Sequence, residues 1–239
     1  MSSAAPGTLR YADFLSHKRG GYLMTYHVSQ RVGAAFALAA HRAGAAPTAL
    51  TLINLVISLG TAALTIAVTP AAHAGHLPWW PIAIVVLIAW QVAYALDCAD
   101  GQLARAAGLG SAAGGRVDIL CDVAAQTGFI ASVAAVTVAY APGTPSWVVA
   151  AFASLWMVNL VTSILQKEEE TASSMVSSKN IVVEIVKLIR DAAVIFLVMP
   201  LILIVNPGWM VWYMAFFAAV NALFLAASIA FTARDALRA

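Results

Sequence analysis

Residues 97–122 read DCADGQLARAAGLGSAAGGRVDILCD, and this charged segment lies between two long stretches without Asp, Glu, Lys or Arg. The uncharged stretches cover residues 43–96 and 123–166, and a third covers residues 192–233. Each is about two helix lengths long, since one membrane-spanning helix needs ~20 residues. Each stretch is therefore expected to hold two helices joined by a short turn.

The composition of the chain argues against a soluble domain. Hydrophobic residues make up 62% of the 239 residues and charged residues only 10%, whereas soluble domains carry about 25% charged residues. The formal net charge of +2 is too small to indicate a nucleic-acid partner. The composition predicts an all-α integral membrane protein.

Turns rich in Pro and Gly divide the three uncharged stretches. They lie at residues 70–81, 142–145 and 206–208. The sequence therefore predicts six transmembrane helices, at about residues 48–69, 80–100, 115–140, 146–166, 180–205 and 209–232.

All charged residues lie on one side of this expected topology. They precede the first helix, follow the last, or lie in the connections at 97–122 and 167–191, while the three alternate turns carry none. Because Lys and Arg favour cytoplasmic loops, both termini and the 97–122 segment are expected on the cytoplasmic side of the cell membrane.

The first 46 residues are expected to form a cytoplasmic N-terminal segment, and residues 47–239 the six-helix catalytic domain. Residues 22–43 have an amphipathic pattern, with Arg31 and Arg42 on the polar face. This pattern predicts an interfacial helix on the inner leaflet, and a helix packed on the bundle is the equal alternative. Its expected apolar face comprises Val28, Val32, Ala35, Phe36 and Ala39.

Four aspartates are spaced so that they can meet at one end of the second and third helices. Asp97 and Asp100 are three residues apart, and Asp118 and Asp122 are four apart. Each pair therefore lies on one helical face. The connection between the pairs is rich in Gly and Ala, which allows the helix ends to approach closely. The four carboxylates are expected to converge at the cytoplasmic edge of the membrane.

The charge of this segment is unbalanced, because it contains four aspartates and only two arginines. Oxygen ligands without a His or Cys partner favour Mg²⁺, Mn²⁺ or Ca²⁺. Two divalent ions that share these carboxylates would suit a phosphoryl-transfer centre. The alternative is that the aspartates cap helix ends and face water.

The segment also follows the spacing D-x2-D-G-x2-A-R-x8-G-x3-D-x3-D. This spacing resembles the signature of the CDP-alcohol phosphotransferase (CDP-alcohol phosphatidyltransferase) family, membrane enzymes that build phospholipid head groups. The six-helix layout is similar to that family as well. The eight matching positions are Asp97, Asp100, Gly101, Ala104, Arg105, Gly114, Asp118 and Asp122.

The resemblance implies a role for each residue of the motif. Asp97, Asp100 and Asp118 would hold two divalent cations, Mg²⁺ or Mn²⁺. Asp122 would be a further ligand and the general base, and Arg105 would contact the diphosphate of the donor. The small residues that would leave room for the cytidine nucleotide are Gly101, Ala104 and Gly114, although Gly101 alone also fits a glycine that ends a helix.

The start of the first helix departs from the family pattern. Family members often carry Pro-Asn-x-x-Thr there, whereas Thr48 follows Pro47 in this chain and only Thr51 aligns, as an expected donor-site residue. A second group of residues would bind a phosphorylated acceptor such as inositol phosphate or glycerol phosphate, although positive-inside anchoring is the better account of any one of them. This group is Arg116, Lys179, Lys187 and Arg190.

The sequence therefore predicts a transferase of substituted phosphate groups. It would move a phosphatidyl group from a CDP-alcohol, with CDP-diacylglycerol as the expected donor, to an acceptor hydroxyl and release CMP. By the same resemblance, a homodimer in the lipid bilayer is expected. Two other classes stay open: a Mg²⁺-dependent membrane prenyltransferase, whose aspartate spacing differs, and an ion-coupled transporter, whose acids would lie near the middle of the membrane.

Overall fold

The structure, a computed structural model, describes residues 9–18, 23–170 and 191–237, and all regular secondary structure in these ranges is helical, as predicted. Two short elements have other helical geometries: η1 is a π-helical turn and η2 a 3₁₀ turn. In chain order the elements are α1 (Tyr11–Ser16), η1 (Thr25–Ser29), α2 (Gln30–Arg42), α3 (Pro47–His73), α4 (Trp79–Ala106), α5 (Ala112–Tyr140), α6 (Ser146–Glu170), α8 (Ala192–Val205), η2 (Pro207–Trp209) and α9 (Met210–Ala236).

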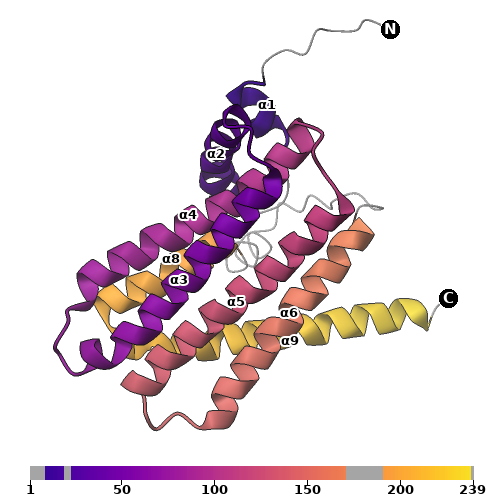
Figure 1. Cartoon of the computed structure of the whole chain (residues 1–239). Helices are drawn as coiled ribbons and strands as arrows, with labels where there is room; N and C mark the ends of the chain where they lie inside the picture. Colours follow the sequence, from indigo (N-terminus) through magenta and orange to yellow (C-terminus); the bar gives the residue numbers. More distant parts are fainter. Residues whose placement is uncertain (1–8, 19–22, 171–190, 238–239) are drawn as a thin grey trace, which may run out of the picture.

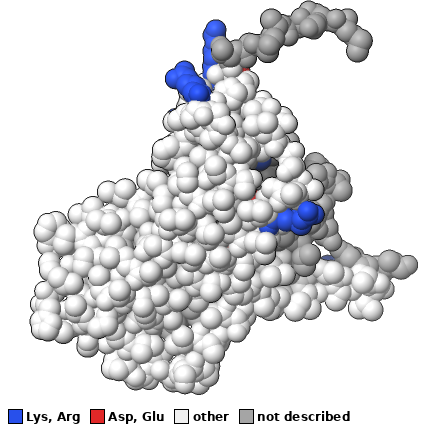
Figure 2. Space-filling model, viewed as in Figure 1, with Lys and Arg blue, Asp and Glu red and all other residues white. Residues whose placement is uncertain are grey.

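The long helices form a bundle with two different ends (Figure 1). The turns that join α3 to α4, α5 to α6 and α8 to α9 lie toward one end, and the α4–α5 connection and the N-terminal helices lie toward the other. On the face drawn in Figure 2, the Lys and Arg atoms gather toward the second end, while the first end is free of charged atoms. On that face, the charged residues and the uncharged turns therefore lie at opposite ends of the bundle, as the sequence predicted.

Four helical stretches are long and apolar enough to cross a membrane: Pro47–His73, Trp79–Ala106, Ala112–Tyr140 and Pro207–Arg234. Two shorter apolar stretches, Ser146–Thr162 and Ala192–Val205, fall below that length. Helix thus occupies the six predicted ranges, apart from residues 180–190, which lie outside the described residues. Six membrane crossings and their orientation remain predictions.

The centre of the bundle is an aromatic cluster that joins four helices. Trp90 of α4 stacks on Phe196 of α8 with a centroid distance of 4.9 Å, and it meets the ring of Phe129 of α5 edge to face at 5.3 Å. Phe129 also contacts Trp156 of α6 at 5.5 Å. All four rings are buried, so the two helices that carry the aspartates are held to the rest of the bundle by aromatic packing.

Helix α2 packs against α4 through its smallest residues. The exposed side chains include Val28 and Val32, which are 48% and 42% exposed. Most of the expected apolar face is therefore exposed, although Phe36 is half-buried against the core, and the helix packs on the bundle mainly through another face, as the alternative had it. Contact of the outward face with the inner leaflet remains a prediction. The buried face comprises Gly33, Ala34, Ala37 and Ala40.

The contact between α2 and α4 depends on the absence of a side chain at Gly33. A Cβ at this position would lie 3.0 Å from the carbonyl oxygen of Ala95 and 3.2 Å from the amide nitrogen of Ala99, both backbone atoms of α4. Gly33→Ala should therefore force the helices apart and lower stability by about 1–3 kcal/mol, the usual cost of overpacking. The measurement is thermal unfolding of the purified protein in detergent.

The matched control is Gly60→Ala in α3, because nothing lies within 4 Å of a Cβ there. That variant should be neutral or slightly stabilised, since Ala favours the helix more than Gly does. Equal stability of the two variants would contradict the close contact between α2 and α4.

Candidate active site

The first aspartate pair lies inside α4 rather than at its end. The helix continues past Asp100 to Ala106 and ends before Gly108, whose φ of +66° is a left-handed conformation that glycine adopts easily. The predicted end near residue 100 is therefore wrong, because the run from Gly101 to Ala106 contains no proline and several good helix formers. The alternative interpretation of Gly101 as a glycine that ends the helix is wrong for the same reason.

The second aspartate pair lies inside α5, and neither of its members caps the helix. Ser111 is the N-cap residue, and its hydroxyl oxygen accepts a hydrogen bond of 3.0 Å from the backbone N–H of Gly114. Asp118 and Asp122 follow on consecutive turns of the helix. The alternative that the aspartates serve as caps is therefore wrong.

Three of the four aspartates bring carboxylate oxygens to one place. One oxygen each from Asp97, Asp100 and Asp118 lies within 4.8 Å of the others. Asp100 is buried, and the other two are half-buried. Asp122 is not a member of this trio, but its carboxyl group lies beside that of Asp97. The predicted convergence is therefore confirmed for the trio, with Asp122 at its edge.

The donor set of this cluster fits a hard divalent cation. Two carboxylate charges no more than 4.8 Å apart repel each other by about 3 kcal/mol or more at the effective dielectric of partly buried sites. A cation that binds oxygen ligands removes this repulsion, and carboxylates are the ligands that Mg²⁺ and Mn²⁺ prefer. Among the described residues, these three aspartates form the group that could hold a metal ion.

Helix α3 adds two polar contacts to the aspartates. Thr51 donates a hydrogen bond of 2.5 Å from its hydroxyl to Oδ2 of Asp100, and Asn54 donates one of 3.5 Å from its amide to Oδ1 of Asp97. The sequence singled out Thr51 as a donor-site residue, and the structure places it against a predicted metal ligand. Asn54 was missed, although its position three residues after Thr51 on the same helical face is a signal that the sequence contains.

Gly101 leaves room for the side chain of Arg105. A Cβ at Gly101 would lie 2.9 Å from Nη1 of Arg105, so the guanidinium group passes directly over the glycine. The Nε–H of Arg105 donates to the backbone carbonyl of His17 at 3.1 Å. The arginine of the motif is therefore held between Gly101 of α4 and the N-terminal segment.

Gly114 lies opposite the start of α3. A Cβ there would lie 3.1 Å from the hydroxyl of Ser111 and 3.6 Å from that of Thr48, the residue that stands where the family often has Asn. Ala104, like Gly114, is half-buried. A role for Gly101, Ala104 and Gly114 in making room for the nucleotide remains a prediction.

The expected acceptor residues are only partly described. Arg116 is exposed in the first turns of α5. Lys179, Lys187 and Arg190 lie outside the described residues. A phosphate pocket for the acceptor therefore remains a prediction.

Two polar contacts that the sequence did not reveal hold the N-terminal segment on the bundle. The buried carboxylate of Asp191, the N-cap residue of α8, accepts hydrogen bonds from the backbone N–H groups of Met24 and Thr25 at 2.9 and 3.0 Å. The amide of Gln102 on α4 donates to the backbone carbonyl of Gln30 at 2.9 Å. Both contacts position the segment whose His17 carbonyl accepts from the arginine of the motif.

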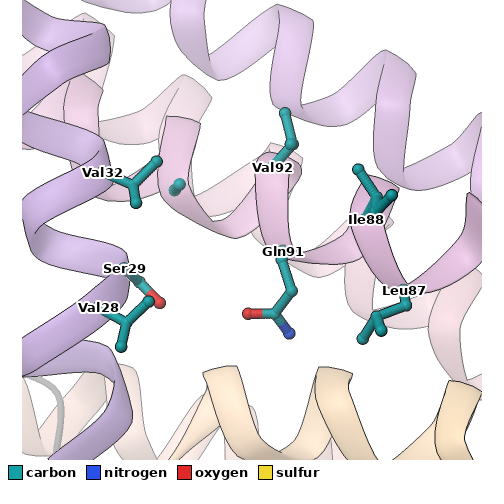
Figure 3. Close-up of a pocket in the computed structure, with 8 residues that line it drawn as sticks. Val28, Ser29, Val32, Leu87, Ile88, Gln91 and Val92 are labelled. Carbon is teal, nitrogen blue, oxygen red and sulfur yellow. The ribbon is translucent and has the colours of Figure 1, made fainter. Parts of the chain in front are cut away.

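An apolar pocket lies on the other side of α4, below α2. It has a volume of about 210 Å³, and Figure 3 shows it between the N-terminal helices and α4. Its walls on α4 include Ile88, Val92 and Ala95, which lie about half a helical turn around the axis from Asp97. The pocket is therefore separate from the aspartate cluster.

Comparison with known proteins identifies the family of the chain. A family model described as CDP-alcohol phosphatidyltransferase matches residues 44–233, which include the whole aspartate motif and the helices from α3 through most of α9. The resemblance seen in the motif is thereby confirmed. No curated protein matches the chain.

The aspartate cluster predicts a specific loss of metal binding. Asp118→Asn removes one carboxylate from the trio and should weaken Mn²⁺ binding by about 100-fold or more, since even outer-shell partners are worth 10–100-fold in affinity. The measurement is electron paramagnetic resonance of free Mn²⁺ in a titration of the purified protein.

The control variant is Asp13→Asn in α1, which removes a carboxylate that accepts from the backbone N–H of Arg10, the N-cap residue of that helix, and that does not belong to the trio. It should bind Mn²⁺ as the wild type does. Unchanged binding in Asp118→Asn would rule out a metal site at the trio.

Proposed function

Because the chain belongs to the CDP-alcohol phosphatidyltransferase family, we propose that it transfers a phosphatidyl group from CDP-diacylglycerol to an acceptor hydroxyl and releases CMP. The family supports a transferase that acts on a CDP-alcohol. The observation that carries the proposal is the convergence of Asp97, Asp100 and Asp118, because a diphosphate donor needs concentrated positive charge that these carboxylates can bind.

In the proposed mechanism the trio holds two divalent cations, Mg²⁺ or Mn²⁺. Bound cations would supply positive charge to the phosphoryl oxygens and to the departing CMP. Arg105 contacts the donor diphosphate through the part of its guanidinium group that lies over Gly101. Thr51 fixes the rotamer of Asp100 through its hydrogen bond.

The proposed base is Asp122, which lies at the edge of the trio beside Asp97. A carboxylate whose oxygens are all taken by cations is a poor base, whereas one at the edge can accept the proton of the acceptor hydroxyl. The hydroxyl oxygen then forms a bond to the β-phosphorus of the donor. The bond from that phosphorus to the oxygen of CMP breaks, and CMP leaves with the electron pair.

The membrane placement of the site suits a lipid donor. The trio is carried by α4 and α5, both long and apolar enough to span a membrane. It lies in the C-terminal half of α4 and near the start of α5, and Figure 1 shows the connection between these two helices toward the end with the N-terminal helices. In the proposed arrangement the donor tails stay in the bilayer and the nucleotide binds on the cytoplasmic side, where both chain termini lie. The acceptor phosphate pocket around Arg116 and the homodimer belong to this proposal as well.

The family match favours neither of the two alternative classes. A membrane prenyltransferase does not require the Gly, Ala-Arg and Gly positions of the motif. An ion-coupled transporter is expected to carry its acids near the middle of the membrane. Here Asp97 and Asp100 lie in the C-terminal half of α4, past its midpoint and toward the α4–α5 connection.

A direct test incubates the purified protein with CDP-diacylglycerol, Mg²⁺ and a panel of free alcohols, amino-alcohols and alcohol phosphates. Release of CMP that depends on one acceptor, with a matching lipid product, is the expected result and identifies the acceptor. A chelator should abolish the release, and added Mg²⁺ or Mn²⁺ should restore it. CMP release that survives thorough chelation would contradict the two-metal mechanism.

The role of Asp122 can be separated from that of the trio by one variant. Asp122→Asn should lower kcat by about 10²–10⁴-fold, the usual contribution of a general base. Metal-dependent binding of the CDP-lipid should stay close to that of the wild type, because the trio is intact. Binding and turnover are measured on the same preparation, with Asp118→Asn for comparison. If Asp122→Asn loses metal and donor affinity together with turnover, Asp122 is a metal ligand and not the base.

A further inference from the structure

A stripe of buried polar side chains runs along α3 on the face that packs against α4 and α5. Every member is at most 5% exposed, although the helix is long and apolar enough to span a membrane. Buried polar groups in such a helix need a hydrogen-bond partner. The stripe comprises Thr51, Asn54, Ser58, Thr61, Thr65 and Thr69.

The far half of the stripe meets this need within its own helix. Thr61, Thr65 and Thr69 each donate to the backbone carbonyl four residues earlier, at 2.7, 2.8 and 2.7 Å. Such bonds satisfy the hydroxyl without any neighbouring helix. These threonines therefore let α3 pack closely but make no polar contact with another helix.

The half of the stripe near the aspartates behaves differently, because Thr51 and Asn54 each donate a hydrogen bond to an aspartate of α4. Asn54 donates from its amide nitrogen to Oδ1 of Asp97 at 3.5 Å. Ser58 donates from its hydroxyl to the amide oxygen of Asn54 at 3.0 Å. Because the serine hydroxyl occupies the oxygen of the amide, the NH₂ group is the part of Asn54 that faces the carboxylate.

An amide at this position suits a carboxylate that must bind a cation. A Lys or Arg partner would cancel the negative charge of Asp97 and repel a divalent ion. A neutral donor instead limits the rotation of the carboxylate and leaves its negative charge in place. Hydrogen bonds of this kind orient the ligands of metal sites, and their loss typically lowers metal affinity by about 10–100-fold.

We infer that Asn54, oriented by Ser58, is a positioning residue that sets the direction of the Asp97 carboxylate toward the cation shared with Asp100 and Asp118. The inference rests on the proposed function, in which this trio binds the catalytic divalent ions. Since the contact of 3.5 Å is long, Asn54 steers Asp97 and does not lock it. Removal of the Asn54 amide should therefore lower metal affinity by an amount near the lower end of the range of about 10–100-fold.

The test compares Mn²⁺ binding and catalysis in Asn54→Ala and Ser58→Ala with the wild type. Mn²⁺ binding is measured without donor by electron paramagnetic resonance, and CMP release is measured over a range of Mg²⁺. Asn54→Ala should raise the Mn²⁺ Kd by about 10-fold, and Ser58→Ala should shift it in the same direction by less. The loss of CMP release in Asn54→Ala should be largest at low Mg²⁺ and should shrink as Mg²⁺ is raised, because excess cation offsets the weaker binding.

The matched control is Thr65→Val, which replaces a buried hydroxyl of the same stripe that bonds only its own helix. This variant should bind Mn²⁺ as the wild type does. An equal loss of Mn²⁺ affinity in Thr65→Val and Asn54→Ala would mean that packing of α3, and not the amide, is responsible, and it would overturn the inference. Ser58→Ala carries the test if Asn54→Ala does not fold, and unchanged Mn²⁺ affinity in Ser58→Ala would then overturn the inference.

Different results would contradict the proposed metal site and the positioning role of Asn54. Wild-type protein that binds no Mn²⁺ would contradict the metal site of the proposed function and this inference with it. Wild-type binding that Asn54→Ala leaves unchanged would overturn the positioning role alone. A variant with normal Mn²⁺ affinity but a raised KM for the donor would assign Asn54 to the donor site instead.

Discussion

Repulsion among the carboxylates of Asp97, Asp100 and Asp118 is the constraint around which this bundle is arranged. Their oxygens lie within 4.8 Å of one another on two helices that are otherwise apolar, and neighbouring charges at that distance repel strongly in a partly buried site. The fold tolerates the arrangement because packing elsewhere fixes α4 and α5. The aromatic cluster around Trp90 and Phe129 supplies that packing.

The aspartates are held by partners from other parts of the chain. Helix α3 supplies Thr51 and Asn54, which donate to Asp100 and Asp97. The N-terminal segment supplies the carbonyl that accepts from Arg105. That segment is in turn attached to α8 by the buried carboxylate of Asp191. The site is therefore a product of the whole bundle, and its geometry depends on residues that are far from the motif in sequence.

The same arrangement explains why polar chemistry and a membrane bundle can coexist. Polar side chains along α3 bond their own helix where the neighbours are apolar, and bond across to α4 where the aspartates lie. Buried polar groups are costly in a membrane protein unless they are satisfied. The polar contacts between α3 and α4 are thus concentrated at the end of α3 near the aspartates. A CDP-linked lipid would place its charged group at this end while its tails stay in the bilayer.

The sequence by itself determined the helical fold and the identity of the aspartates that meet. Helical periodicity places residues three or four apart on one face, so the sequence predicted that Asp97 and Asp100 share a face of one helix and Asp118 and Asp122 a face of the next. The connection rich in Gly and Ala between the two pairs then led us to expect that they converge. Periodicity says nothing about which face of another helix packs against them. That is why Asn54, 43 residues from Asp97, and the buried face of α2 were decided only by the tertiary structure. The end of α4 was also misjudged, because an aspartate and a glycine do not stop a helix whose following residues favour it.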